Sequence, residues 1–180
     1  MGKLEIAANP GKGGVGQAAG EPLTVNEIFY SIQGESSYAG LPCVFVRLTE
    51  CNLRCSYCDT EYAFYEGIAM PLERVLEEVE KYRCDLVEIT GGEPLLQPSV
   101  HKLMSQLIER GKKVLLETGG SLDISPVPSG VTIILDIKTP GSKMDHQNLW
   151  SNFDVLKPAD EIKFVVCDRE DYEWARQVIL

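Results

Sequence analysis

The sequence is poor in basic residues and in long apolar segments, and each shortage excludes a class of protein. Lysine and arginine number 17 against 27 aspartates and glutamates, which gives a formal net charge of −10. Such a chain offers no basic surface for a phosphate backbone, so we expect no nucleic-acid partner. No stretch is apolar enough to cross a bilayer and no signal-peptide pattern is present, so we expect no membrane partner and a cytoplasmic location.

Length and composition predict one globular domain preceded by an arm. The chain has 180 residues, of which 44% are hydrophobic, and this is enough to bury a core. Residues 1–22 are rich in Gly, Ala and Pro and are predicted to form a flexible N-terminal arm. Residues 23–180 are predicted to form the domain.

The six cysteines are not spaced as a disulfide framework. Cys51, Cys55 and Cys58 lie in the run ECNLRCSYCDT with the spacing C-x3-C-x2-C. This clustering, without a secretory signal, favours a reducing compartment. The other three cysteines lie in or beside apolar runs and are predicted to be small buried side chains: Cys43, Cys84 and Cys167.

Three thiolates from one loop do not complete a metal site. A structural zinc ion takes four ligands, and an iron–sulfur cubane has four iron corners. Three cysteines would therefore leave one iron open to a small molecule. The alternatives are a zinc site completed by His101, His146 or a distant cysteine, and three unrelated buried thiols.

Short apolar runs alternate with amphipathic segments along the domain, which is typical of a parallel sheet with helices outside. Strands are predicted over residues 24–30, 43–49, 86–90, 113–117, 131–138 and 161–167. Helices are predicted over residues 71–83, 99–110 and 169–180, with Asp168 as the N-cap of the last.

Side-chain alternation places charge on one face of each expected strand. In residues 43–49, Val44, Val46 and Leu48 share one face and Arg47 lies on the other. A parallel strand buried on both faces is continuously hydrophobic, and buried charge needs partners or water. We therefore expect an α/β fold, a partial (β/α) barrel with a curved parallel sheet that borders a polar cavity. The alternative is an antiparallel sheet with one solvated face.

Polar motifs follow the expected strands at the end where such barrels carry their chemistry. The cysteine loop follows the strand at residues 43–49, and the run TGGEP at residues 90–94 ends the next one. Glycines there let backbone pass close to a ligand. Glu117 and the segment from Asp136 to Lys138 end the following two strands.

The cysteine loop, with Tyr57 before its third cysteine, resembles the signature of the radical S-adenosylmethionine (SAM) enzymes. The resemblance implies a [4Fe-4S] cluster on Cys51, Cys55 and Cys58, with SAM on the open iron. It also implies that GGEP binds the SAM amino group and that other strand ends contact SAM. The implied SAM-binding residues are Tyr57, Cys58, Asp59, Gly92, Glu93, Glu117, Asp136, Ile137 and Lys138.

Segments on both sides of the cysteines narrow the resemblance. The runs NEIFYSIQGE (residues 26–35), GLP (40–42) and VFVRL (44–48), with Asp59 and Thr60 after the last cysteine, are similar to 7-carboxy-7-deazaguanine synthases. This resemblance implies conversion of 6-carboxy-5,6,7,8-tetrahydropterin to 7-carboxy-7-deazaguanine with loss of ammonia, in queuosine biosynthesis. It further implies Mg²⁺ as a cofactor, a homodimer, and an electron donor such as a flavodoxin.

The same resemblance implies a substrate site. Arg47 would bind the substrate carboxylate, since a guanidinium fork matches a carboxylate. Ile32, Gln33 and Gly34 would contact the pterin, as would Thr90. Residues counted as catalytic are therefore Arg47 and the three cluster cysteines. Arg47 could instead form a salt bridge to Glu88 or Glu117.

Thr60 is the residue implied to bind Mg²⁺, through a hydroxyl oxygen that such an ion accepts. Its alternative role is that of a turn or cap residue. Two other functions remain open for the chain. An activase of a glycyl-radical enzyme shares the cysteine spacing, and a zinc-stabilised binding module would have no catalysis.

The last expected helix ends on Val178, Ile179 and Leu180 without a Gly, Pro or polar cap. We therefore expect the radical SAM domain to be truncated at its C-terminus, since similar enzymes continue into a sixth strand. We also expect weak substrate binding from the 180-residue form unless a partner chain closes the barrel.

Overall fold

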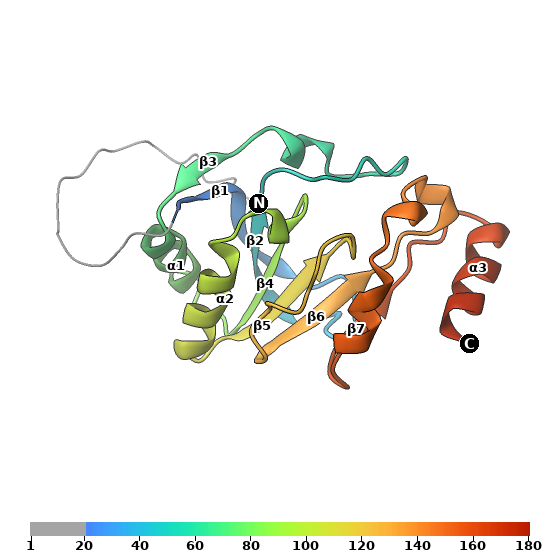
Figure 1. The fold of residues 1–180 in the computed structure, drawn as a ribbon. Helices are drawn as coiled ribbons and strands as arrows, with labels where there is room; N and C mark the ends of the chain where they lie inside the picture. Colours follow the sequence, from blue (N-terminus) through green and yellow to red (C-terminus); the bar gives the residue numbers. More distant parts are fainter. Residues whose placement is uncertain (1–20) are drawn as a thin grey trace.

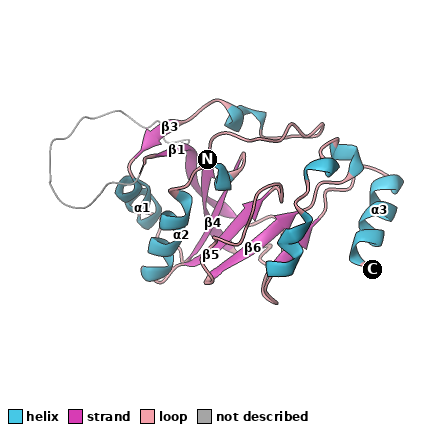
Figure 2. Ribbon diagram, in the orientation of Figure 1, coloured by secondary structure: helices cyan, strands magenta, loops and turns pink. Residues whose placement is uncertain are grey.

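A computed structural model describes residues 21–180, and its centre is a seven-stranded mixed sheet (Figures 1 and 2). The strand order is β3-β1-β2-β4-β5-β6-β7. From β2 to β7 the neighbours are parallel, whereas β1 is antiparallel to both β2 and β3. The strands are β1 (Leu23–Ile32), β2 (Pro42–Leu48), β3 (Ile68–Met70), β4 (Leu86–Gly91), β5 (Lys113–Thr118), β6 (Val131–Asp136) and β7 (Glu161–Lys163).

In the part of the chain that the structure describes, three α-helices accompany the sheet: α1 (Leu72–Glu80), α2 (Val100–Glu109) and α3 (Arg169–Ile179). Helices α1 and α2 lie together on one side of the sheet, and α3 lies beyond β7 (Figure 1). Their apolar stripes explain this placement, since Val75, Leu76 and Val79 of α1 are buried and α2 repeats the spacing. The predicted N-cap of α3 is confirmed, because the Asp168 carboxylate accepts a hydrogen bond from the Asp171 amide at 2.9 Å.

The core lies between the sheet and α1 and α2. The apolar strand faces supply it, for example Val44 and Val46 of β2 with Ile89 of β4, all fully buried. Among the lone cysteines, Cys43 and Cys84 are buried as predicted. The prediction for Cys167 was wrong because its strand ends earlier than expected, which leaves this side chain exposed in the loop before α3.

The alternating α/β pattern is confirmed, with differences at the sheet edges. The antiparallel strand β3 was missed, since three residues are too short to show a periodicity. Strand β7 stops at Lys163 because β6, its one neighbour among residues 21–180, stops at Asp136, shortly before Pro140. The predicted arm lies almost entirely outside the described residues. No helix within residues 21–180 combines the length and apolar character needed to span a membrane.

Candidate active site

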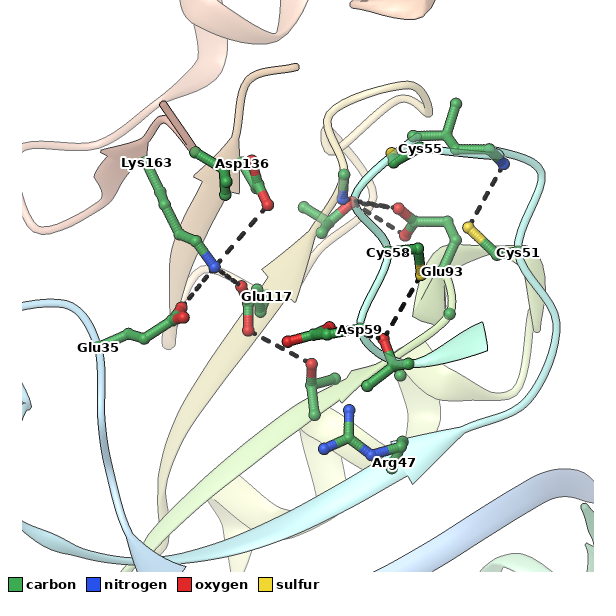
Figure 3. Close-up of a pocket in the computed structure, with 18 of the residues that line it drawn as sticks. Glu35, Arg47, Cys51, Cys55, Cys58, Asp59, Glu93, Glu117, Asp136 and Lys163 are labelled. Atoms are coloured by element: carbon green, nitrogen blue, oxygen red, sulfur yellow. Dashed lines mark hydrogen bonds and ion pairs between the residues drawn. The ribbon is translucent and has the colours of Figure 1, made fainter. Parts of the chain in front are cut away.

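A cavity of about 450 Å³ opens at the carboxyl ends of the parallel strands. Each of the five parallel strands contributes at least one polar side chain to it, among them Arg47 of β2, Thr90 of β4, Glu117 of β5, Asp136 of β6 and Lys163 of β7. Figure 3 shows four of these: Arg47, Glu117, Asp136 and Lys163. The predicted alternation explains this, because the apolar neighbours of these residues face the core. The expectation of a polar, ligand-sized cavity is confirmed.

The cysteine loop forms one wall of the same cavity. Cys51, Cys55 and Cys58 all line it, and all three are free thiols (Figure 3). Within residues 21–180, however, no group of three or more Cys, His, Asp or Glu side chains is arranged to hold a metal ion. The three thiols therefore do not form a site for a single metal ion, whereas a cubane takes each of three thiolates on a separate iron corner.

Burial raises the pKa of Cys51 and of Cys55, so both favour the protonated thiol in the absence of positive charge. Lys138 acts in the opposite direction on both thiols and partly offsets the burial. Iron ions would supply the charge that makes thiolates favourable here. His101 and His146 do not line the cavity, so neither completes a four-ligand zinc site with these thiols.

The glycines of TGGEP allow the end of β4 to touch the backbone that leads into the cysteine loop. A Cβ on Gly92 would lie 2.0 Å from the Glu50 carbonyl oxygen, and one on Gly91 would lie 2.2 Å from that of Leu48. Two backbone hydrogen bonds join the segments, from Gly92 N to Leu48 O at 3.1 Å and from Glu93 N to Glu50 O at 2.7 Å. Only glycine permits this approach.

The Glu93 carboxylate is fully buried and is held by protein donors. It accepts hydrogen bonds from Thr118 Oγ1 at 2.9 Å, from Gly119 N at 2.8 Å and from Leu95 N at 3.1 Å. Burial raises the pKa of Glu93, and these donors work against that rise. Glu93 therefore ties the end of β4 to the end of β5 at the cavity wall.

A charged network joins the ends of β5, β6 and β7 at the cavity (Figure 3). Lys163 Nζ pairs with the carboxylates of Glu35 and Glu117 and lies 3.8 Å from Asp136 Oδ2. Although burial alone lowers the pKa of Lys163, Glu117 and Asp136 outweigh it and raise that pKa above its usual value. Lys138 forms a buried ion pair with Asp136 at 2.9 Å.

Glu88 is a buried carboxyl group in the cavity floor that the sequence did not assign to the site. Burial, followed by the neighbouring Glu117 carboxylate, raises its pKa to about 8. Its Oε2 accepts a hydrogen bond from Gln33 Nε2. Gln33 Oε1 in turn accepts from the amides of Gly34 at 2.8 Å and of Glu35 at 3.2 Å, so the Gln33 side chain orders the loop after β1.

Arg47 is paired with neither Glu88 nor Glu117, so that alternative is wrong in this structure. Its Nε donates to Glu27 Oε1 at 2.8 Å, and its terminal nitrogens point into the cavity (Figure 3). Thr60 also lines the cavity, and it precedes a short 3₁₀ helix without capping it through its hydroxyl. That hydroxyl lies 3.3 Å from Asp59 Oδ1 and 3.8 Å from Cys58 Sγ.

Two of the residues assigned from sequence do not line the cavity. Ile32 is largely exposed at the end of β1, and Ile137 is fully buried in the core. The structure adds lining residues that sequence reasoning did not place in the site: Glu35, Phe45, Leu53, Phe64, Glu88, Lys163 and Val165. Strand alternation could have placed Glu88 and Lys163 in the site, since both lie on the strand face that carries the assigned polar residues.

Comparison with known proteins identifies the family. The radical SAM superfamily model matches residues 46–169. The 7-carboxy-7-deazaguanine synthase of Koribacter versatilis (strain Ellin345) is 50% identical over 157 residues, which cover 86% of this chain and 70% of that protein. The chain belongs to the 7-carboxy-7-deazaguanine synthase family of radical SAM proteins. The Chlorobaculum tepidum member is 47% identical over 88% of this chain and 73% of its own length.

The fold agrees with this membership. The crystal structure of QueE from Escherichia coli superposes with a TM-score of 0.70 at 23% identity, covering 88% of this chain and 77% of that one. In the present chain, the region matched by the superfamily model contains all three loop cysteines and the ends of the parallel strands. Superfamily membership implies a [4Fe-4S] cluster and SAM as cofactors.

Proposed function

We propose that the chain is a 7-carboxy-7-deazaguanine synthase, which converts 6-carboxy-5,6,7,8-tetrahydropterin to 7-carboxy-7-deazaguanine with loss of ammonia in queuosine biosynthesis. The observation that carries the proposal is the 50% identity to the Koribacter versatilis synthase over 86% of the chain. A single cavity that brings three thiols next to polar strand ends supports it.

Cys51, Cys55 and Cys58 would hold the [4Fe-4S] cluster through three of its irons. The donor set fits, because three thiols border one cavity and, within residues 21–180, no fourth cysteine or histidine does. When bound, the reduced cluster and SAM supply a 5′-deoxyadenosyl radical that takes hydrogen from C6 of the substrate, and SAM is regenerated.

The cluster side of the cavity would bind SAM. Backbone at residues 57–59 would contact the adenine, and Gly92, which lines the cavity next to the cysteine loop, would contact SAM. Glu93, Glu117 and Asp136 through Lys138 would contact its polar groups. Support for Lys138 comes from Asn148, whose side-chain amide bonds both the N–H and the C=O of Lys138 at 2.9 and 2.8 Å and so fixes this strand end.

The opposite side would bind the pterin. Arg47 would pair with the carboxylate, and Thr90 would contact the ring. Gln33 and Gly34 would contribute through the loop that Glu88 orders, and Ile32 would contribute where β1 enters that loop. With its pKa near 8, Glu88 holds a proton at neutral pH, so the cavity floor presents a neutral acid beside the Glu117 carboxylate.

Thr60 would bind Mg²⁺ beside the substrate. Its hydroxyl is free of a capping role and lies next to Asp59, an oxygen pair of the kind that Mg²⁺ accepts while it keeps several waters. We expect Thr60→Ala to weaken the dependence of the rate on magnesium while the iron content stays the same. Superimposable magnesium titrations for variant and parent would contradict this role.

A homodimer, a flavodoxin as electron donor and a cytoplasmic location complete the proposal. The exposed apolar side chains Ile162, Val166 and Tyr172, on or beside β7 and α3, support a subunit contact. All six cysteines are free, which supports a reducing compartment. Light scattering at several protein concentrations tests the dimer, and reduction of the cluster by flavodoxin in place of dithionite tests the donor.

The decisive experiment is anaerobic reconstitution with iron and sulfide, followed by incubation with SAM, magnesium and 6-carboxy-5,6,7,8-tetrahydropterin. We expect about four irons per chain and formation of 7-carboxy-7-deazaguanine. Cys55→Ala should abolish both, and Cys43→Ala is the matched control because Cys43 is buried in the core.

The possible outcomes distinguish the synthase from a radical SAM enzyme with another substrate and from a zinc-binding module. An iron-loaded protein that cleaves SAM without forming the deazaguanine acid would show a radical SAM enzyme with another substrate. A parent protein that binds zinc and takes up no iron–sulfur cluster would refute the cluster assignment. A Cys55→Ala variant that keeps the full iron content or full activity would refute it as well.

A further inference from the structure

A β-bulge places Glu27 opposite Arg47. The register between β1 and β2 shifts after Val25, so that Val25 pairs with Leu48 and Glu27 pairs with Arg47. Without the shift Asn26 would stand opposite Arg47, and Glu27 would share the core-facing side with Val25. The extra residue therefore turns the Glu27 side chain to the face on which Arg47 lies. Bulges beside active sites commonly re-aim a side chain in this way.

Glu27 occupies one particular nitrogen of the guanidinium. The contact runs from Arg47 Nε to Glu27 Oε1 at 2.8 Å, and it is the only hydrogen bond or ion pair of the Arg47 side chain within residues 21–180. The N–H groups on Nη1 and Nη2 of the Arg47 guanidinium therefore remain available to a ligand. Figure 3 shows this end of Arg47 directed into the cavity.

Two aromatic rings restrict the same guanidinium. Its Cζ lies 5.8 Å from the Phe29 ring centroid and 5.9 Å from that of Tyr62. Phe29 is itself stacked on Phe45, with ring centroids 5.0 Å apart. The Tyr62 hydroxyl donates to the same Glu27 oxygen at 3.2 Å, which links the segment after the cysteine loop to β1.

We propose that Glu27 is a positioning residue that holds Arg47 through Nε, so that the Nη1–Nη2 edge meets the carboxylate of the substrate. This inference deepens the proposed function and rests on the role given there to Arg47. A guanidinium on a long side chain has many rotamers, and fixing it before binding reduces the entropy lost when the carboxylate arrives. End-on pairing then sets both the position and the plane of the carboxyl group.

Orientation matters here because the hydrogen to be removed is on C6, the carbon that carries the carboxylate. A substrate anchored in the wrong plane would turn this hydrogen away from the radical. The 5′-deoxyadenosyl radical would then take a hydrogen atom from another donor, and 5′-deoxyadenosine and methionine would accumulate in place of regenerated SAM. A misoriented substrate therefore raises the ratio of 5′-deoxyadenosine to product, whereas general destabilisation of the fold lowers both.

The test compares Glu27→Ala, Glu27→Gln, Arg47→Ala and the double alanine variant with the parent. Binding is measured by fluorescence with 6-carboxypterin, which has no hydrogen on C6, and with pterin, which lacks the carboxylate. Turnover is followed as the ratio of 5′-deoxyadenosine to product. Glu77→Ala is the matched control, because Glu77 forms an exposed ion pair with Arg74 on α1, remote from the cavity.

We expect the parent to prefer 6-carboxypterin over pterin by about tenfold or more, as a charged fork contact provides. Glu27→Ala should lose most of that preference and raise the 5′-deoxyadenosine ratio, whereas Glu27→Gln, which keeps an acceptor for Nε, should restore both. The double variant should behave like Arg47→Ala, since two residues that act through one contact are not additive.

An unchanged preference and ratio in Glu27→Ala, beside a clear loss in Arg47→Ala, would overturn the inference and leave the proposed function intact. The inference would also be overturned if the loss of preference in the double variant equalled the product of the losses in the two single variants. If Arg47→Ala keeps the full preference, the role of Arg47 in the proposed function fails and the inference fails with it.

Discussion

Gly92→Ala should separate the end of β4 from the cysteine loop. The added Cβ would lie 2.0 Å from Glu50 O, 2.5 Å from the Glu50 carbonyl carbon and 2.9 Å from Cys51 Cβ. Ordinary contact begins at 3.4 Å, so the two backbones must move apart by about 1.4 Å. Neither atom of Glu50 belongs to a flexible side chain that could turn away.

The cost follows from the bonds that this movement breaks. Overpacking costs about 1–3 kcal/mol. The hydrogen bond from Glu93 N to Glu50 O, 2.7 Å long, would be lost as well, and an unsatisfied buried group adds about 1–3 kcal/mol. We expect the free energy of unfolding to fall by about 2–6 kcal/mol, which is a large part of the stability of an ordinary domain.

Urea denaturation of the metal-free protein measures this free energy, and iron content after reconstitution measures the effect on the loop that carries Cys51. Gly34→Ala is the matched control for stability, because an added Cβ there meets nothing within 4 Å. An unchanged urea midpoint and full iron content in Gly92→Ala would refute the argument from close approach.

Two further predictions concern buried groups at the cavity. The folded pKa of Glu88, about 8, lies above its unfolded value of 4.5, so its contribution to stability is present at low pH and is lost as pH rises from about 4.5 through 8. Glu88→Gln should therefore flatten the decline of the urea midpoint between pH 5 and 8 relative to the parent, and parallel curves would contradict this. Thr118→Val keeps the side-chain shape but removes a donor to the buried Glu93 carboxylate, and should lower the free energy of unfolding by about 1–3 kcal/mol. An unfolding curve identical to that of the parent would show that the other donors to Glu93 suffice.

The parts of the fold that depend on local pattern could be predicted from the sequence. The helices α1 and α2 follow from apolar spacing, and the polar cavity follows from the charged faces of strands such as β4 and β6. The loop cysteines and the residues around them were found because their spacing is itself chemical information. The three cysteines line one cavity, together with Tyr57, Asp59 and Thr60.

Features that depend on register between strands could not be predicted. The bulge that turns Glu27 toward Arg47 leaves no periodic signal, so the expected partners were Glu88 and Glu117. Likewise, Glu88 pairs with Leu115 across the sheet, and only this register brings Glu117 close enough to affect its proton. The short strand β7 ended early because pairing, rather than propensity, sets its length.

The charge balance of the cavity lining acts as a filter on what can enter. Six acids line it, namely Glu35, Asp59, Glu88, Glu93, Glu117 and Asp136, against the three bases Arg47, Lys138 and Lys163. Even with Glu88 protonated, negative groups outnumber positive ones. Within the cavity this excess sets up a negative electrostatic potential. A sulfonium cation such as that of SAM is therefore drawn in, whereas an uncharged thioether of the same shape gains nothing from the field.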